Sequence, residues 1–514
     1  MTNCVQMPSR IVNAALFGIA KATDHNDGLE DSRDMQLESI EAGLLKFRTR
    51  NLWMSSSPGT VELVEFQFLR GFIYQISLNI VSVVQQNNHY SISASFLSSE
   101  SEQKFWSVFF TNMRPLDKPK EVKEWPRLPG RGQYTESARQ RRLSFIEEHT
   151  GVEMKHIGNT DIQPETLKRV TESFIGTVEI PVGAAGPLMF YGQHVKGHIF
   201  AAMATTEGSL IASATRGATA ITCSGGVTTA VLDRRIARVP LFQMADLHDA
   251  LFLAQWVKSR FLDIRKQTQL MSKHADLKRI EPQILGRDLH MHFVYDSGDA
   301  AGQNMTTGCT WKACHWIMDQ ISDTFGIKVN RFIIESNLSN DKKVTYNNFM
   351  FGRGTRSVAE CKLTAKATKR ILNVTPDQLV SGYHSLTAGA IASGMIGVNI
   401  NIANMVAAIF TATGQDIASV HESSVGHLTM DLVDNGEAVY ASLVLPSLLI
   451  GTVGGGTRLP HQNEALRMIG CDGTGKSPRL AEIICGFALA LDISTLSALV
   501  ADEFAAAHHP LVAK

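Results

Sequence analysis

Residues 378–415 read QLVSGYHSLTAGAIASGMIGVNINIANMVAAIFTATGQ, a run of 38 positions without lysine, arginine, aspartate or glutamate. The run is long enough to cross a membrane. However, Ser381, His384, Asn399 and Asn404, together with several glycines, interrupt every window of 18 residues. Small residues at this density favour helices that pack closely. The run therefore predicts a buried pair of helices and no membrane span.

The composition around this run is that of a soluble globular protein. The 514 residues include 49 Lys+Arg and 49 Asp+Glu, so the formal net charge is zero. This balance argues against a basic surface for nucleic acid, and 44% hydrophobic residues argue against a disordered chain. At roughly 150 residues per domain, the length predicts three to four domains, or two large ones with an insertion.

The cysteines indicate a reducing compartment. Seven of them are scattered along the chain without a CxxC pair, which predicts neither a disulfide framework nor a zinc site. We expect no metal, and we interpret His290 and His292 as structural. The first 23 residues lack acids and carry Arg10 and Lys21. This composition fits an ordinary N-terminus and a cytoplasmic location better than a mitochondrial transit peptide.

Hydrophobic periodicity predicts helices and strands along the rest of the chain. Residues 112–135 are rich in proline, glycine and charge, which is typical of a linker. We expect residues 240–335 to form a separate α+β insertion and residues 360–514 to be mostly helical. The other expected elements are a helix over 137–150, strand and turn over 174–188, an amphipathic helix over 242–273, and strands over 283–295 and 327–334.

The segment Gly470–Ser477 (GCDGTGKS) matches the phosphate-binding pattern G-x-x-x-x-G-K-[ST]. A true phosphate-binding loop follows a buried strand, whereas residues 461–469 have the spacing of a helix. We therefore predict a connector between two helices. A nucleotide triphosphatase remains the alternative.

Five short segments place polar residues among glycines and alanines. An acid in such a segment is expected to lie partly buried, which raises a carboxyl pKa and suits a general acid. Each segment alone could be a cap or a loop, but their order along the chain is far more specific. The segments are Ala204-Thr-Thr-Glu-Gly208, Asp299–Met305, Asp341-Lys-Lys343, Thr413-Gly-Gln-Asp416 and Gly451–Thr457.

Together with Ile175–Pro187 and Gly352-Arg-Gly354, these segments resemble the signatures of the 3-hydroxy-3-methylglutaryl-coenzyme A (HMG-CoA) reductase family, in its eukaryotic and archaeal biosynthetic class. The resemblance runs from about residue 135 to 510. It implies an α+β fold, in which a large, mainly helical substrate-binding domain carries an inserted ferredoxin-like cofactor-binding domain. The implied divisions are an unassigned segment 1–105, a linker and small helical domain 106–175, a substrate-binding and dimerisation domain 176–239 with 331–514, and an NADP(H)-binding domain 240–330.

The resemblance implies that the chain reduces HMG-CoA to mevalonate and CoA with two NADPH, in the pathway that supplies isoprenoids and sterols. It also implies a homodimer or homotetramer with active sites at a subunit interface. Reduction of a thioester creates an oxyanion that a cation can stabilise, and Lys342 matches the family's catalytic lysine. His508, or else His509, would protonate the departing thiolate. Glu207, kept protonated by burial, would protonate the aldehyde oxygen, and Asp416 would lie between Glu207 and Lys342 and couple their titrations.

The same resemblance assigns binding residues. Arg238 would hold substrate, Ser336 and Lys343 would contact the substrate carboxylate region, and Asn404 would lie near the reacting carbonyl. No G-x-G-x-x-G fingerprint is present, and the family needs none. The full assignment is Arg238, Ser336, Asp341, Lys343 and Asn404 for HMG-CoA, and Asp299, Ala301, Gly302, Gln303, Asn304 and Met305 for NADPH.

The chain departs from the family pattern in three places. The loop Glu335–Asn340 is one residue short, so the assignment of Ser336 depends on the alignment. Asn401 stands where this class often has histidine, and the tail His508–Lys514 lacks the Asn-Arg-Ser that often follows the catalytic histidine. The tail leaves the choice between NADPH and NADH open. A divergent paralogue and a non-catalytic binder of HMG-CoA are the further alternatives.

Overall fold

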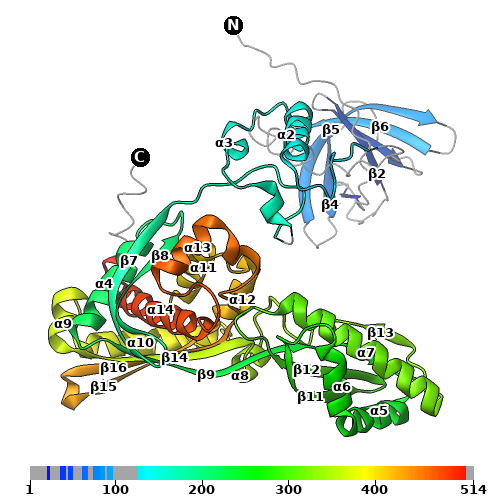
Figure 1. Ribbon diagram of the computed structural model, residues 1–514. Coiled ribbons are helices and arrows are strands. Elements are labelled where there is room, and N and C mark those ends of the chain that lie inside the picture. Colours follow the sequence, from blue (N-terminus) through cyan, green and yellow to red (C-terminus); the bar gives the residue numbers. More distant parts are fainter. Residues whose placement is uncertain are drawn as a thin grey trace. The chain divides into compact units, whose positions relative to one another are not determined.

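The computed structural model describes residues 125–168 and 170–504, together with six strands between residues 20 and 96. The chain forms two compact units, residues 1–126 and 127–514 (Figure 1). Each unit is described by itself.

The first unit contains an antiparallel six-stranded sheet in the order β1-β4-β5-β6-β3-β2. Ile92 and Ala94, two positions apart on β6, are buried together with Leu45 and Ile80. The sequence interpretation left this segment unassigned. The strands are β1 (Ala20–Thr23), β2 (Met35–Glu41), β3 (Leu44–Thr49), β4 (Val61–Gln67), β5 (Ile73–Gln86) and β6 (His89–Phe96).

The second unit mixes helices with a ten-stranded sheet whose main path is β13-β10-β12-β9-β14-β16-β15. Strand β9 is central, since it pairs with β14 over Thr228–Arg235 and with β12 over Ile236–Arg238. The strands are β7 (Val182–Gly192), β8 (Lys196–Ala204), β9 (Val227–Arg238), β10 (Leu241–Gln243), β11 (Asp276–Leu285), β12 (Asp288–Asp296), β13 (Arg331–Ile333), β14 (Gly354–Thr364), β15 (His427–Val433) and β16 (Ala438–Leu448).

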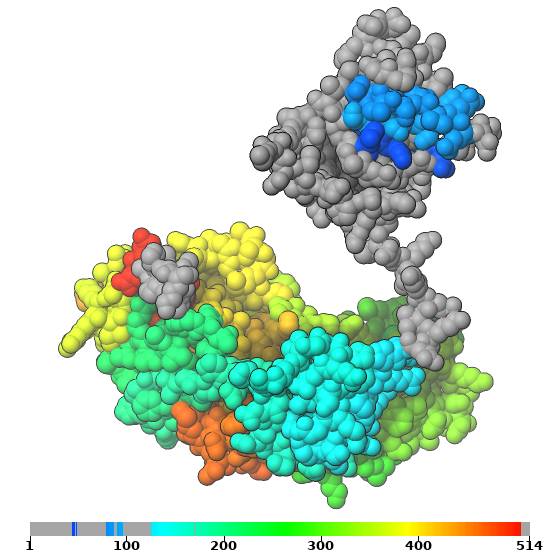
Figure 2. Space-filling model, turned by 90° about the horizontal axis from the view of Figure 1, so that it is seen from above, coloured from blue at the N-terminus to red at the C-terminus, as the bar shows by residue number. Residues whose placement is uncertain are grey.

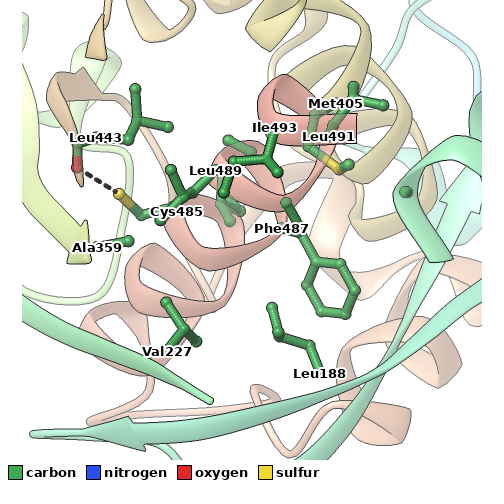
Figure 3. Close-up of a cluster of buried hydrophobic side chains, with 14 of the residues drawn as sticks. Leu188, Val227, Ala359, Met405, Leu443, Cys485, Phe487, Leu489, Leu491 and Ile493 are labelled. Carbon is green, nitrogen blue, oxygen red and sulfur yellow. Dashed lines mark hydrogen bonds between the residues drawn. The ribbon is translucent and has the colours of Figure 1, made fainter. Parts of the chain in front are cut away.

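Helix α14 (Ser477–Val500), drawn in red in Figure 1, lies at the centre of the larger hydrophobic core. Twenty of its 24 residues are buried. In Figure 3, Phe487 and Leu489 lie among side chains from strands and from helix α11 (Ile402–Thr413), and the Cys485 thiol contacts the carbonyl oxygen of Leu443. Within the described residues, α14 is also the one helix long and apolar enough to cross a membrane, but 89% of its apolar window is buried inside the protein.

The predicted helix pair is present, but only one of its helices is mostly buried. Helix α11 contacts β8, α13 (Pro460–Met468) and α14, and eight of its 12 residues are buried. Helix α10 (Pro376–Ala392) packs through one face and leaves Leu386 and Ile391 exposed. The exposed end of α10 belongs to the yellow surface in Figure 2. The absence of charge therefore marks a core helix in one case and an apolar surface in the other.

A second hydrophobic core is formed mostly by residues 236–332. There, helices α5 (Leu247–Ser259), α6 (Phe261–Gln269) and α7 (Gln303–Phe325) pack on strands β9–β13. Two predictions here were wrong. The helix expected over 242–273 is preceded by β10 and breaks at Arg260, whose φ of −105° is not helical. The strand expected over 283–295 is the hairpin β11–β12, which turns at Gly286 (φ 64°).

The prediction that residues 360–514 are mostly helical also missed a hairpin, so the unit is mixed rather than mainly helical. Strands β15 and β16 join through Asp434-Asn435-Gly436, all with positive φ, which Asn and Gly tolerate well. The helix expected over 137–150 is confirmed as α2. The remaining helices are α2 (Glu136–Thr150), α3 (Lys155–Gly158), α4 (Leu210–Cys223), α8 (Tyr346–Phe351), α9 (Ala365–Ile371), α12 (Val420–Ser423) and α13 (Pro460–Met468).

Helix α4 packs so closely on α14 that a Cβ atom at Gly217 would overlap the backbone carbonyl of Ala490. Because backbone cannot move aside cheaply, Gly217→Ala should lower the free energy of unfolding by about 1–3 kcal/mol. The measurement is urea unfolding of the full chain. The control is Gly308→Ala in α7, where the nearest atom would be 3.6 Å away. Helix propensity should make that variant more stable by up to about 1 kcal/mol. Equal effects of the two changes would contradict the close packing.

Candidate active site

The structure joins Lys342 and Asp416, which lie far apart in the sequence. The Nζ atom of Lys342 is 2.9 Å from Oδ2 of Asp416, and both side chains are about one-third exposed, at 41% and 34%. Asp416 precedes the 3₁₀ helix η2 (Ile417–Ser419), and its Oδ1 accepts a hydrogen bond from the amide of Ala418. The backbone of Lys342 is left-handed (φ 56°), which is uncommon for a residue other than glycine. A charged pair is thus held on a constrained loop.

Glu207 and Asn404 form a second pair. The side-chain amide of Asn404, in the first turn of α11, lies 2.6 Å from both carboxylate oxygens of Glu207. Glu207 is exposed, so the expected burial is not found within one chain. Among the described residues, no hydrogen bond joins Glu207 to Asp416, and the expected contact between these two acids is not seen.

A cavity of about 260 Å³ opens beside Glu207. It lies between the start of α4, the start of α11 and the last turns of α14, so it combines apolar and polar walls. An extended organic chain with a polar end could enter it. The apolar wall is formed by Leu210, Ala212, Leu491, Ala498 and Phe504, and the polar groups are Ser209, Ser213, Arg216, Asn401, Thr495 and Glu503.

Beneath Lys342 lies a network of charged side chains. Arg353 donates from Nη2 to Asp341 at 2.9 Å, and its Nε is 3.5 Å from Glu422. Arg238 lies 2.6 Å from Glu335 and 3.6 Å from Asp341. The sequence predicted roles for Arg238 and Asp341. No role was predicted for Glu335, Arg353 or Glu422. Arg353, within the quoted Gly352-Arg-Gly354, was the available signal.

The pKa of the buried Glu422 carboxyl is raised overall above its ordinary value. Burial raises its pKa, while its own backbone amide, the Arg353 guanidinium and the backbone amide of Lys342 lower the pKa in turn.

Two other predicted binding residues make local contacts. Ser336 donates its hydroxyl to the carbonyl of Val239, and Lys343 donates to the carbonyl of Asp341. Their roles toward substrate stay predictions, and His508 lies outside the described residues.

Asp299 connects the predicted cofactor segment to α14. Its carboxylate accepts hydrogen bonds from the amides of Gly475 at 2.7 Å and Ser477 at 3.1 Å. Burial alone would raise its pKa, but these amides, the Ser477 hydroxyl and nearby Arg234 lower it overall.

The Gly470–Ser477 loop is a connector between helices, as predicted, and two of its amides are already engaged by an internal carboxylate. This contact disfavours a nucleotide triphosphatase.

The rest of the cofactor segment forms the start of α7. Gly302 is the N-cap residue (φ 84°), and no side chain caps this end of the helix. Gln303 donates its side-chain amide to Asp341 at 3.3 Å and to Ser419 at 3.2 Å. Gly451 approaches so closely that a Cβ there would lie 2.7 Å from the amide of Ala301. Open backbone amides at a helix start can bind a phosphate group. Asn304 is exposed in this first turn, and Met305 accepts a contact from Ser272.

Asp492, fully buried in α14, fixes the beginning of α11. Its two oxygens accept hydrogen bonds from the amides of Asn401 at 2.6 Å and Ile400 at 3.1 Å. Burial raises the pKa of Asp492 to about 7, against the effect of these two hydrogen bonds. Because Asn404 follows within one turn, Asp492 helps to place the amide that contacts Glu207. Among the described residues, no group of three or more His, Cys, Asp or Glu could hold a metal ion.

Comparison with known proteins identifies the family of this arrangement. The family model for hydroxymethylglutaryl-coenzyme A reductase matches residues 138–513. The 3-hydroxy-3-methylglutaryl-coenzyme A reductase of Methanocaldococcus jannaschii is 40% identical over 374 residues, which span 72% of this chain and 91% of the relative. The reductase of Aeropyrum pernix is 39% identical over 389 residues, spanning 74% of this chain and 90% of the relative.

The fold is also found among solved structures. The class II 3-hydroxy-3-methylglutaryl-CoA reductase from Streptococcus pneumoniae, bound to NADPH, aligns with a TM-score of 0.52. The alignment covers 70% of this chain and 97% of that one at 18% sequence identity. At this identity the likeness concerns the fold alone.

Asp492→Asn should flatten the pH dependence of stability. A carboxyl whose pKa is raised from 3.8 to about 7 on folding stabilises the protein fully below about pH 4. This contribution is lost as the pH rises through about 7, and it amounts to a few kcal/mol because one pKa unit corresponds to about 1.4 kcal/mol. Urea unfolding between about pH 4 and 8 measures the slope. The exposed Asp431→Asn is the control, and an unchanged slope in Asp492→Asn would show that Asp492 does not titrate in this range.

Proposed function

Because the chain belongs to the hydroxymethylglutaryl-coenzyme A reductase family, we propose that it reduces HMG-CoA to mevalonate and CoA in two hydride transfers from NADPH. The observation that carries this proposal is the ion pair between Lys342 and Asp416, which joins two of the family's signature segments. We place the enzyme in the mevalonate route to isoprenoids, in the cytoplasm. The sequence hint of a mitochondrial signal falls almost wholly outside the described residues.

Lys342 supplies positive charge where the first reduction needs it. Hydride addition to the thioester carbonyl leaves negative charge on its oxygen, and a preorganised ammonium group stabilises that charge as it develops. Asp416 orients the ammonium group through the 2.9 Å contact. The C–S bond then breaks, and the CoA thiolate takes a proton, for which His508 is our candidate.

Glu207 serves the second reduction. Hydride addition to the aldehyde carbon leaves an alkoxide, which must gain a proton to become the hydroxyl of mevalonate. Asn404 holds the Glu207 carboxyl through its side-chain amide. We place the pantetheine arm of CoA along the apolar wall of the adjacent cavity, and the substrate carboxylate near Lys343, Arg238 and Ser336.

We assign NADPH to the segment Asp299–Met305 and to an inserted domain of about residues 240–330, carried by the larger substrate-binding part. NADPH, when bound, supplies the hydride for each step. The residues present fit such a ligand, since the start of α7 has no side-chain cap. In support, the structurally similar reductase from Streptococcus pneumoniae was solved with NADPH. Asp299 holds this segment on the α14 connector.

We further propose that a second copy of the chain covers the active site. Glu207 is exposed, although a proton donor at this position works best when shielded from water. The neighbouring surface is apolar, because Ile417 beside Asp416 is 50% exposed, and Tyr346 and Met350 form an exposed stripe along α8 at 69% and 60%. Such a surface is expected to be buried in an assembly, at least a homodimer.

Lys342→Ala should reduce kcat by about 100- to 1,000-fold, the range found when one stabiliser of a developing oxyanion is removed. The assay follows NADPH oxidation with HMG-CoA in the purified full chain and repeats it with NADH. Lys476→Ala, in the connector, is the control and should leave turnover unchanged. Folded wild-type protein that oxidises neither NADPH nor NADH would refute the reductase proposal. HMG-CoA binding without turnover would support a non-catalytic binder, and Mg²⁺-dependent ATP binding lost in Lys476→Ala would support a triphosphatase.

Met350→Asp should weaken self-association, because it places a charge in the apolar stripe on α8. Sedimentation velocity should show a shift toward monomer, with a loss of turnover at low protein concentration. Leu262→Asp changes an equally exposed leucine of α6 (68%) and should leave the assembly intact. A monomeric wild-type protein with full activity would contradict the proposed shared site.

A further inference from the structure

The two loops that carry Lys342 and Asp416 are joined a second time below the surface. The first connection is the exposed ion pair itself. The second runs from Asp341, the residue before Lys342, through Arg353 to Glu422 in α12, which follows Asp416 and η2 directly. The same two segments are therefore linked by two parallel ion-pair connections.

The buried connection is strongly protected from solvent. The side chain of Arg353 is 1% exposed and that of Glu422 is 0% exposed. Arg353 also donates to the carbonyl of Ala237 at the end of β9, and its backbone amide donates to Ser447. Neither oxygen of Glu422 has a hydrogen-bond partner of ordinary geometry among the described residues, so its compensation comes from Arg353 at 3.5 Å and from nearby backbone amides.

We propose that Arg353 and Glu422 are positioning residues that hold the Lys342 loop against the Asp416 loop. This inference rests on the proposed reductase function. A buried ion pair adds little net stability compared with apolar side chains of similar size, so its presence beneath an active site points to a role in geometry. Neither residue reaches the surface at which Lys342 and Asp416 meet, so both act through their neighbours, Arg353 through the carboxylate of Asp341.

The Lys342 loop needs such support because its backbone is strained. Lys342 and Asn340 both have left-handed φ values, 56° and 59°, which cost free energy and persist only when the surroundings enforce them. Arg353 holds the side chain of Asp341, between these two positions. The backbone amide of Lys342 lies near the Glu422 carboxylate and lowers the pKa of that carboxyl. Loss of either charge would let the loop relax and move the Lys342 ammonium away from the reacting carbonyl.

Gln303 adds a third connection that reaches the inserted part of the chain. Its amide donates to Asp341 and to Ser419, and Arg238 approaches its carbonyl at 3.5 Å. The charged groups that act on Glu422 are Arg353, which lowers its pKa, and Asp341, which raises it. These contacts connect the surrounding side chains to one another through Asp341.

The test is steady-state kinetics of the full-length Glu422→Gln variant, which keeps size and removes charge. A misplacement of about 1 Å at a catalytic group can cost about 100-fold in rate, so kcat should fall by up to about that factor while KM for HMG-CoA changes little. Glu422→Asp, which keeps the charge, should recover part of kcat. Arg353→Lys should resemble Glu422→Gln, because one ammonium cannot contact both acids as the guanidinium does.

The matched control is Glu482→Gln. Glu482 is also a fully buried carboxylate, but it contacts His194 and Thr229, away from Lys342. Both glutamine variants should lower the melting temperature, and only Glu422→Gln should lower kcat of the folded protein. Equal kcat values in the two variants, or a parallel loss of kcat and melting temperature, would overturn the positioning role. An inactive wild-type protein would instead refute the reductase function itself.

Discussion

The burial of α14 is the constraint on which the larger unit depends. An apolar helix of 24 residues must be covered on all sides, and strands β7, β9, β14 and β16 together with helices α4, α10 and α11 cover it. A buried helix cannot leave its polar groups without partners. Glu482 accepts hydrogen bonds from His194 and Thr229, and Ser494 contacts Ser213 and Arg216. Each polar interruption of α14 therefore fixes a different part of the surrounding chain.

Two of these contacts extend directly to the candidate active site. Asp492 caps the start of α11 and thereby places Asn404 against Glu207. At the N-terminal end of α14, the amides of Gly475 and Ser477 donate hydrogen bonds to Asp299. These bonds hold the loop that leads into α7. The proposed proton donor and the proposed cofactor segment thus share one buried helix as a common support. This arrangement explains why a loop with the letters of a phosphate-binding motif serves as a structural contact.

The family resemblance anticipated one long-range contact, whereas periodicity misjudged parts of the path of the chain. The resemblance implied that Asp416 lies beside Lys342, and the structure places the two side chains 2.9 Å apart. The hairpins β11–β12 and β15–β16 were missed, although Gly286 and Asn435-Gly436 are typical turn signals and alternating apolar residues flank the second turn. Glu422 could not be found from sequence, since its role depends on the distant Arg353. The exposure of Glu207 was also missed, because composition cannot separate burial within a chain from burial against another copy.

The uncharged run around residues 378–415 shows how neutral residues can place a charged one. Gln415, buried at the end of this run, bonds through its amide to both the carbonyl and the amide of Gly451. Gly414 turns the chain with φ 70°, and a Cβ there would overlap the backbone of Gly456. These contacts turn the chain away from the axis of α11 before Asp416. The carboxylate of Asp416 therefore lies at the surface beside Lys342. A charged residue in place of Gln415 would be buried without a partner, which costs desolvation free energy. The acid instead lies one position later in the chain, where Lys342 can compensate its charge.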